Sequence, residues 1–438
     1  MSKIKTFMKR MGIGLLIIVI LLGGSGGFYF MSYLPNTIAP KSFPQTDGEI
    51  KLDGLDGTVD VYRDKTGVPH IYATTSHDLF YAEGYVHAQD RFWQMDVSRH
   101  IGSGSLSEMF GKSPLSKDLF LRTLGWARVG EQELKLLSPE NLGRMQAYAD
   151  GVNAYLADHK GNTASLEYSI VSLLAPGYKP EPWTPLNSIT WGKAMAWDLG
   201  KGRLFSEVER SILLKTLTPE QLADLYPPYP KENPYIVNDF VLGASPQQQE
   251  AQLAAQTLDI SSLFASIAEK QKSLDGILGP GSESIGSNNW VISGALTATG
   301  KPMLANDMHL DQQIPSIWYE ADLQCLPVSK ECPFNVSGFS FPGVPGIVAG
   351  HNQRIAWGFT NVGPDVVDLY IEKINPETPN QYEVNGKWMD MTIVEESIKI
   401  AGQDQPEKLI VRYTRNGPII SDTYGPLKQQ RDDGTPGF

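Results

Sequence analysis

The sequence predicts an α+β protein with a helix-rich first part and a sheet-rich second part. Apolar residues recur at helical spacing over residues 76–100, whereas short apolar runs separated by Gly and Pro turns follow residue 287. A stretch rich in Gln, Ala and Ser, residues 242–286, separates the two parts. With 41% hydrophobic residues in a chain of 438, a large buried core is expected.

The charge of the chain argues against a nucleic-acid partner. The sequence holds 49 acidic and 37 basic residues, which gives a formal net charge of −12. Binding to phosphate backbones needs clustered Lys and Arg, and no such cluster is seen.

The first 34 residues have the pattern of a signal anchor. Basic residues precede an uncharged stretch, 11–34, which is about long enough to cross a bilayer at roughly 20 apolar residues per span. We expect residues 1–34 to stay attached as a transmembrane segment, with the rest of the chain in the periplasm or at the cell surface. A buried helix of a soluble protein is the alternative, but Gly23–Gly27 would break it.

The two cysteines, Cys325 and Cys332, lie seven positions apart around a loop that contains a proline. In an oxidising compartment this arrangement favours a local disulfide over a metal site, which would need more ligands nearby. Free buried thiols are the alternative.

Residues 35–241 are expected to form the helix-rich part, beginning with a tether over residues 35–48. A hairpin is predicted over residues 58–73, followed by a long helix over residues 76–100 that Ser76 caps. Further helices are predicted at 139–158, 187–199, 206–216 and 219–226.

Residues 242–286 are expected to be a spacer with weak helical character, and residues 287–438 the sheet-rich part. Short strand-like runs in the sheet-rich part are NWVISG (289–294), PMLAND (302–307), GIVAG (346–350), VDLYIEKI (367–374) and KLIVRYT (408–414).

The junction between spacer and sheet, GSESIGSNNWVISG, places Ser287 where the first strand begins. A serine hydroxyl is a weak nucleophile that needs a base within hydrogen-bond reach. If the bond between Gly286 and Ser287 were cut, Ser287 would gain an α-amine with a pKa of about 7.7–8.0, a suitable base at neutral pH. Gly286 leaves its carbonyl open to attack by the Ser287 hydroxyl. A simple surface loop is the alternative.

Three segments resemble the penicillin acylase (penicillin amidase) family of N-terminal-nucleophile hydrolases. They are VYRDKTGVPHIYA followed by GYVHAQDRFWQMD, GSNNWVISG at the junction, and GHNQRIAWGFTNVGPDVVDLY. The resemblance covers the chain from about Val59 onward. It implies an αββα four-layer sandwich, in which two antiparallel sheets pack face to face and are covered by helices.

The resemblance also implies self-cleavage between Gly286 and Ser287 into an α and a β chain that form a heterodimer. Ser287 would attack an amide carbonyl while its own amine takes the proton. One oxyanion donor would be the backbone N–H of Asn361, and a second would be an asparagine side chain much further along. Because the β chains of such enzymes are longer, we expect this chain to be incomplete at its C-terminus.

His309 lies at the position where family members carry a Gln or His that contacts the nucleophile. By this resemblance His309 would orient the hydroxyl or tune the amine, and a histidine satisfied in the core is the alternative. Candidates for the acyl pocket are Leu310, Trp318 and Phe341, for each of which core packing is an equal alternative.

The resemblance further implies a calcium site. Family members that bind Ca²⁺ use two aspartates at the spacing of Asp365 and Asp368, the carbonyl at the position of Val367, and a glutamate that matches Glu207. Hard oxygen ligands suit Ca²⁺ rather than zinc. No organic cofactor is expected.

The expected function is hydrolysis of a small N-acyl amide through an acyl-Ser287 ester, with penicillins, acyl-homoserine lactones and related amides as candidate substrates. A rival interpretation is an uncleaved, catalytically silent, surface-anchored homologue with a binding or structural role. A conventional Ser-His-Asp hydrolase is disfavoured because no G-x-S-x-G elbow is seen.

Overall fold

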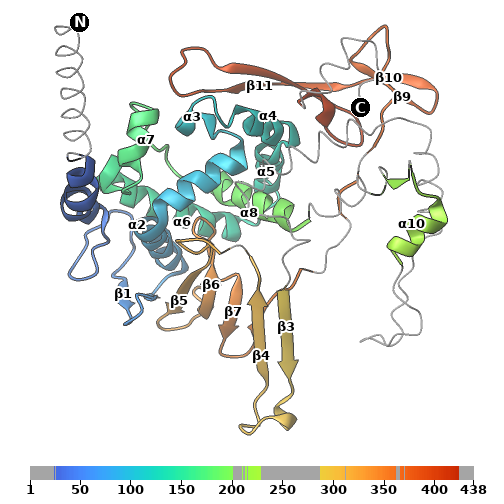
Figure 1. Cartoon of the computed structure of the whole chain (residues 1–438). Helices are drawn as coiled ribbons and strands as arrows, with labels where there is room; N and C mark the ends of the chain where they lie inside the picture. Colours follow the sequence, from blue (N-terminus) through green and yellow to red (C-terminus); the bar gives the residue numbers. More distant parts are fainter. Residues whose placement is uncertain are drawn as a thin grey trace, which may run out of the picture.

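The computed structural model describes residues 24, 26–200, 210, 213–214, 216–227, 287–310, 312–361, 366–368 and 370–423. Helices and sheets are both present, so the α+β class is confirmed (Figure 1). The described residues show helices packed on a six-stranded sheet, and the four-layer sandwich stays a prediction. The predicted spacer 242–286 lies outside the described residues, as do residues 1–23 and 25 of the predicted anchor.

The helices are η1 (Tyr29–Ile38), η2 (Ala39–Ser42), α2 (Ser76–Ser103), α3 (Ser107–Phe110), α4 (Leu115–Leu124), α5 (Trp126–Leu134), α6 (Pro139–Asp158), η3 (Gly161–Thr163), α7 (Tyr168–Leu174), α8 (Pro185–Gly200), α10 (Pro219–Leu225), η5 (Gly294–Leu296) and η6 (Ile420–Asp422). Within the described ranges none of them is both long and apolar enough to cross a membrane. The predicted helix over residues 206–216 falls mostly outside these ranges.

The strands are β1 (Asp60–Arg63), β2 (Pro69–Ala73), β3 (Ser287–Ile292), β4 (Met303–Met308), β5 (Tyr319–Cys325), β6 (Asn335–Ser340), β7 (Ala349–Asn352), β8 (Ala356–Trp357), β9 (Gln381–Val384), β10 (Lys387–Asp390), β11 (Thr392–Ile398) and β12 (Glu407–Tyr413). The prediction of a strand over residues 367–374 is wrong for the part of it that the structure describes. There, Ile374 makes only an isolated bridge with Tyr382.

Helix α2 runs through the centre of the molecule and is buried along most of its length. Its N-cap is Thr75 rather than the predicted Ser76, because the Thr75 hydroxyl accepts the Asp78 N–H at 3.0 Å. The helix ends at Gly104, whose left-handed φ of 63° forms the C-cap. The backbone leaves helical geometry at Arg91, which marks a kink in the middle of the helix.

Helices α2 and α6 approach each other through two glycines. A Cβ atom on Gly84 of α2 would lie 2.0 Å from the Tyr148 carbonyl oxygen of α6, and one on Gly151 of α6 would lie 1.8 Å from the Tyr81 carbonyl oxygen of α2. Real atoms cannot come so close, so the separation of the two helices requires glycine at both positions.

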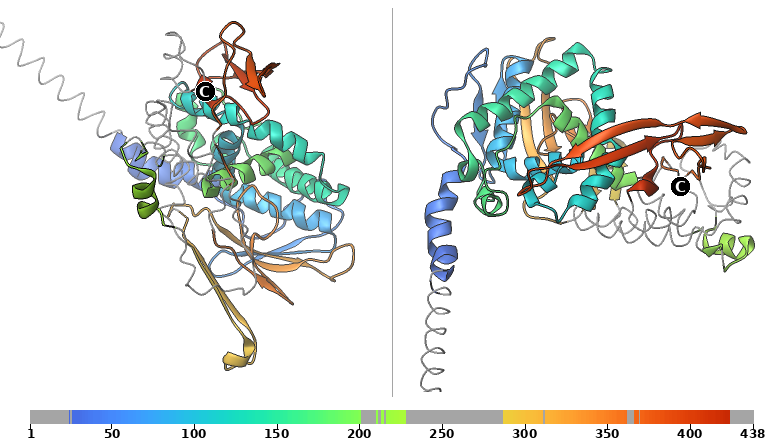
Figure 2. Two further views of the ribbon diagram at one scale, coloured as in Figure 1. Left: turned by 90° about the vertical axis from the view of Figure 1, so that its right-hand side faces the viewer. Right: turned by 90° about the horizontal axis from the view of Figure 1, so that it is seen from above.

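The main sheet has the strand order β1-β2-β5-β6-β7-β8. Strands β2 and β5 pair in parallel, with His70 opposite Asp322, and the other neighbours pair antiparallel. One sheet therefore combines strands from both sides of the spacer. Its side chains Ile71 and Leu323 are buried against Leu79 and Val86 of α2, which lies across the sheet in Figures 1 and 2.

A buried chain of hydrogen bonds ties α2 and α6 to strand β6 and the turn that follows it. The Gly343 N–H donates to the Tyr148 hydroxyl at 2.9 Å, and this hydroxyl lies 2.7 Å from Nδ1 of His87. On the other side of the imidazole, Nε2 lies 3.1 Å from the Ser340 hydroxyl, which donates to the Tyr319 carbonyl. Burial lowers the pKa of His87 to about 3, so its ring is neutral and can accept at one nitrogen and donate at the other.

Glu83, one turn before His87 on α2, holds the loop between β6 and β7. Its two carboxylate oxygens lie 2.8 and 3.0 Å from the Gly346 N–H, which donates to them. Burial raises the pKa of Glu83 to about 8, against an ordinary value of 4.5.

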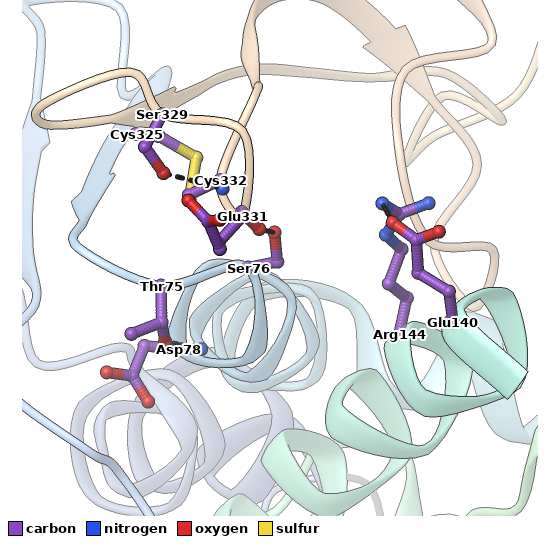
Figure 3. Close-up of a disulfide and its surroundings, with 9 residues drawn as sticks. All are labelled: Thr75, Ser76, Asp78, Glu140, Arg144, Cys325, Ser329, Glu331 and Cys332. Carbon is purple, nitrogen blue, oxygen red and sulfur yellow. Dashed lines mark hydrogen bonds and ion pairs between the residues drawn. A yellow bond between two sulfur atoms is a disulfide. The ribbon is translucent and has the colours of Figure 1, made fainter.

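The structure contains the disulfide between Cys325 and Cys332 (Figure 3). The loop that it closes is stabilised by a hydrogen bond from the Cys332 N–H to the Ser329 hydroxyl at 3.0 Å. The Ser76 hydroxyl at the start of α2 donates to the Glu331 carbonyl of this loop at 2.7 Å, so the disulfide loop is fastened to the central helix.

The remaining strands form three two-stranded ribbons, β3–β4, β9–β10 and β11–β12. The β3–β4 ribbon projects away from the body of the molecule in Figures 1 and 2. The β11–β12 ribbon is held on α4 and α5 by ion pairs from Arg122 and Arg128 to Glu396.

Candidate active site

Ser287 is the first residue of β3 and lies opposite Met308 of β4 in the antiparallel register. It lies at the beginning of the ribbon and is partly buried, whereas the next four residues of β3 are exposed. The bond predicted to be cut cannot be described, because Gly286 lies outside the described residues. Since side chains alternate along a strand, those of Ser287, Asn289, Asn306 and Met308 share one face of the ribbon.

Asn361, the predicted oxyanion donor, lies four residues beyond β8, a strand at the edge of the six-stranded sheet. Its side-chain Nδ2 donates to the carbonyl of Leu199 at the end of α8, at 2.7 Å. The indole N–H of Trp357 in β8 donates to the Val348 carbonyl at 2.9 Å. The segment from Gly358 to Asn361 is thereby anchored at both ends.

Asn306 of β4 connects this segment to the strand of Ser287. Its Oδ1 accepts the Phe359 N–H at 2.9 Å, and its Nδ2 donates to the Phe359 carbonyl at 2.8 Å and to the Asn288 carbonyl at 3.2 Å. Asn288, which follows Ser287, and Phe359, two residues before Asn361, are therefore both hydrogen-bonded to the side-chain amide of Asn306. Sequence reasoning missed Asn306. The alternating pattern of PMLAND, paired with the strand that begins at Ser287, could have identified it, because it places Asn306 on the same face of the ribbon as Ser287.

His309 follows directly after Met308, the residue opposite Ser287. Its Nε2 lies 2.8 Å from the Asp307 carboxylate; the Asp307 side chain is exposed and His309 is partly buried. Across the described part of the chain no hydrogen bond joins His309 to Ser287, so the role of His309 stays a prediction.

The candidate pocket residues Leu310, Trp318 and Phe341 lie in or next to one apolar cluster. Leu310 and Phe341 pack against a core cluster that includes Trp191 and Met195 of α8. The ring of Trp318 stacks on Phe341 with centroids 4.3 Å apart. All three residues are partly buried.

The predicted calcium ligands are described only in part. Val367 is partly buried and Asp368 is exposed, whereas Glu207 and Asp365 lie outside the described residues. The donor set of carboxylates and one carbonyl oxygen has the chemistry that Ca²⁺ prefers.

Comparison with known proteins places this chain in a protein family. The family model described as Penicillin amidase matches residues 58–435. The chain is 32% identical over 389 residues to the acyl-homoserine lactone acylase QuiP of Pseudomonas aeruginosa, covering 88% of this chain and 43% of that protein. It is 30% identical over 387 residues to the penicillin acylase 2 proenzyme of a Pseudomonas species, covering 87% of this chain and 46% of that protein. The chain thus spans less than half the length of these relatives.

Among solved structures, a thermostable penicillin G acylase from Alcaligenes faecalis matches 41% of this chain and 96% of its own, with 26% identity and a TM-score of 0.32.

Proposed function

Because the chain belongs to the penicillin amidase family, we propose that it forms part or all of an N-terminal-nucleophile acylase with Ser287 as nucleophile. The observation that carries the proposal is the link made by Asn306 between the strand of Ser287 and the segment of Asn361. That link supports a nucleophile and an oxyanion donor in one site. The αββα sandwich of N-terminal-nucleophile hydrolases is the fold that we propose for the complete enzyme.

Self-cleavage would create the active form. The Ser287 hydroxyl attacks the Gly286 carbonyl carbon, the C–N bond between the two residues breaks, and the nitrogen takes up the proton. Water then hydrolyses the resulting ester. Gly286 is left with a carboxylate, and Ser287 with a free hydroxyl and an α-amine.

Turnover would repeat this chemistry on an external amide. The Ser287 hydroxyl attacks the substrate carbonyl and passes its proton through a water to its own α-amine, which then protonates the leaving amine. Water hydrolyses the acyl ester and releases the acid. The N–H of Asn361 donates to the oxyanion, a contribution that is typically worth a factor of about 10²–10³. His309, adjacent to the residue opposite Ser287, would orient the hydroxyl or tune the amine.

The proposed substrate is a small N-acyl amide with an apolar acyl group. Two of the relatives are named as acylases of acyl-homoserine lactones and of penicillin. The partly exposed surface of Leu310, Trp318 and Phe341 supports an apolar acyl chain, because burial contributes about 25 cal/mol per Å² of apolar area.

We also propose that Glu207, Asp365, Asp368 and the Val367 carbonyl hold a structural Ca²⁺, for which the hard oxygen donors are suited. Chelation by EDTA should lower the midpoint of thermal unfolding, and Ca²⁺ should restore it where Zn²⁺ does not. An unchanged midpoint would contradict the metal proposal alone.

The same chain is proposed to be held on the outer side of a membrane by residues 1–34. Two exposed tyrosines, Tyr29 and Tyr33, follow the apolar run, and Tyr and Trp are the side chains enriched at membrane interfaces. Carbonate washing of membranes should leave the protein bound, and removal of residues 1–34 should release it.

The nucleophile is tested with Ser287→Ala and with Ser293→Ala, a matched exposed serine on the same ribbon. Wild type and Ser293→Ala should yield two fragments by intact mass, one beginning at Ser287, and should release acid from phenylacetyl or medium-chain acyl amides. Ser287→Ala should remain one chain without turnover, with an unchanged thermal midpoint. Cleavage that persists in Ser287→Ala overturns the mechanism, and an intact, inactive wild-type chain favours the binding or structural alternative.

A further inference from the structure

We propose that Asn306 is a positioning residue that aligns the backbone N–H of Asn361 with the Ser287 hydroxyl. The inference rests on the proposed function and adds to it a residue that acts on the reaction through the segment it holds. Asn306 contacts neither the substrate nor the reacting atoms in this account. Its role is to set the separation between the nucleophile and the oxyanion donor.

The side chain of Asn306 has the placement that this role requires. In the β3–β4 register Asn306 lies opposite Asn289, so its side chain stands on the face that carries the Ser287 side chain. The segment that it binds therefore lies over the face of the ribbon from which Ser287 would attack.

The carboxamide of Asn306 uses both of its donors and its acceptor oxygen. A primary amide offers two N–H donors and an acceptor oxygen. Here Nδ2 donates to the Phe359 and Asn288 carbonyls, and Oδ1 accepts the Phe359 N–H. Both backbone polar groups of Phe359 are thus bound by one side chain, in the way that a neighbouring strand would bind them. A carboxylate or a methyl group at this position cannot make the same set of bonds.

The segment also has little freedom to shift. Gly358 lies so close to Asn306 that an added Cβ would be 2.6 Å from Oδ1 and 2.8 Å from the Asn306 Cβ, so glycine is required for this approach. At the other end, the Asn361 side chain donates to the Leu199 carbonyl of α8. Only Thr360 separates the two anchored residues.

A purely structural role for Asn306 is the competing explanation. The expected sizes of the effects on stability and on reaction rate separate it from a positioning role. A hydrogen bond typically contributes only a small part of the free energy of folding, and the ribbon around Asn306 is largely exposed. A displacement of about 1 Å in an active site can cost about 10²-fold in rate. Loss of Asn306 should therefore affect the rate far more than the fold.

The test uses the full-length protein with Asn306→Asp, which keeps the shape, and Asn306→Ala. Asn289→Ala, the cross-strand neighbour on the same face, is the matched control. We expect both Asn306 variants to cleave themselves more slowly and to lose about 10²-fold in kcat with KM changed less than about threefold, while Asn289→Ala behaves as wild type. Gly358→Ala should reproduce the loss, because it crowds the same contact from the other side.

The affinity for a boronic acid transition-state analogue is a measurement that would not change if Asn306 had only a structural role. Its affinity should fall in parallel with kcat/KM in the Asn306 variants, whereas affinity for the product acid should stay constant. Wild-type kcat in Asn306→Asp, or a loss of kcat that merely follows loss of folded protein, overturns this inference alone. A wild-type chain that neither cleaves itself nor hydrolyses amides overturns the proposed function, and this inference with it.

Discussion

Helix α2 and the β3–β4 ribbon are opposite in character. The helix is buried by α6, α8 and the main sheet. Glycines allow backbone contact with α6, and the buried His87 is hydrogen-bonded to Tyr148 of α6 and to Ser340 of the sheet. The ribbon projects into solvent, where Val291 is 70% and Leu296 82% exposed. Yet the ribbon carries the proposed nucleophile. Stability and proposed chemistry thus reside in different parts of the molecule, and substitutions in the two parts should change different measurements.

The difference in burial between α2 and the ribbon also explains why the side-chain amide of Asn306 matters for the position of the ribbon. A buried element is held by dense packing on all sides, so no single contact determines its place. The described part of the ribbon has few buried side chains, and its position near Asn361 depends on directional bonds such as those of Asn306. Four stability measurements test this contrast between the helix and the ribbon, and they are ordered by the size of the change in free energy that we expect.

A substitution at the close approach of α2 and α6 should give the largest loss of stability. Gly151→Ala places a methyl group where the Tyr81 carbonyl oxygen lies, which forces α2 and α6 apart, and we expect a loss of more than about 3 kcal/mol. Gly143→Ala on the same helix meets open space and should instead stabilise the protein by about 0.5–1 kcal/mol. Urea unfolding measures both. Equal tolerance of the two substitutions would mean that the helices are not packed as described.

Glu83 should make the free energy of unfolding depend on pH. The folded protein keeps this proton up to about pH 8, whereas the unfolded chain releases it near the ordinary pKa of 4.5. The free energy of unfolding should therefore fall as pH rises between these values, by at most about 1.4 kcal/mol per pH unit. Glu83→Gln keeps an acceptor for the Gly346 N–H and should remove this slope. If the difference between variant and wild type is the same at pH 5 and pH 8, the carboxyl group is not protonated when buried.

The disulfide loop should contribute less. Opening the short loop between Cys325 and Cys332 by the double substitution to Ala should cost about 2–3 kcal/mol in the loop-entropy model. Reduced wild-type protein is the control and should lose a similar amount. A change below about 0.5 kcal/mol in both would indicate that contacts such as that of Ser76 with Glu331 hold the loop without the bond.

The ribbon should give the smallest effect. Val291→Thr puts a hydroxyl group on a side chain that is mostly in water, and we expect less than about 0.5 kcal/mol. The matched change Val152→Thr, at a fully buried position of α6, should cost about 1–3 kcal/mol because the hydroxyl loses its water. A larger loss at Val291 than at Val152 would reverse the comparison.

Local signals in the sequence were enough for several elements. Helix α6 coincides with the predicted 139–158, because Ser138 caps it, Pro139 suits its first turn, and both signals act within a few residues. The cysteine spacing likewise pointed to the bond between Cys325 and Cys332. In the same way, the junction motif marked Ser287 as the start of a strand, which it is.

The cap of α2 and the strand partners were not decided locally. Ser76 and Thr75 are both good caps, and Ser76 instead bonds to the Glu331 carbonyl, more than 250 residues away. Strands β5 and β6 escaped prediction, although β5 pairs with β2 in the main sheet. Residues 367–374 had the composition of a strand, but along their described part the pairing is limited to an isolated bridge between Ile374 and Tyr382.

Local patterns were sufficient to predict the α+β class, the family, the ends of well-capped helices and the residue at which the sheet-rich part begins. Those properties depend on side-chain periodicity, turn chemistry and motifs that are read over short distances. The link that Asn306 makes between the strand of Ser287 and the segment of Asn361 arises only in the folded chain. Hydrogen bonds between remote residues depend on where the backbone has been carried, and local pattern does not encode that position.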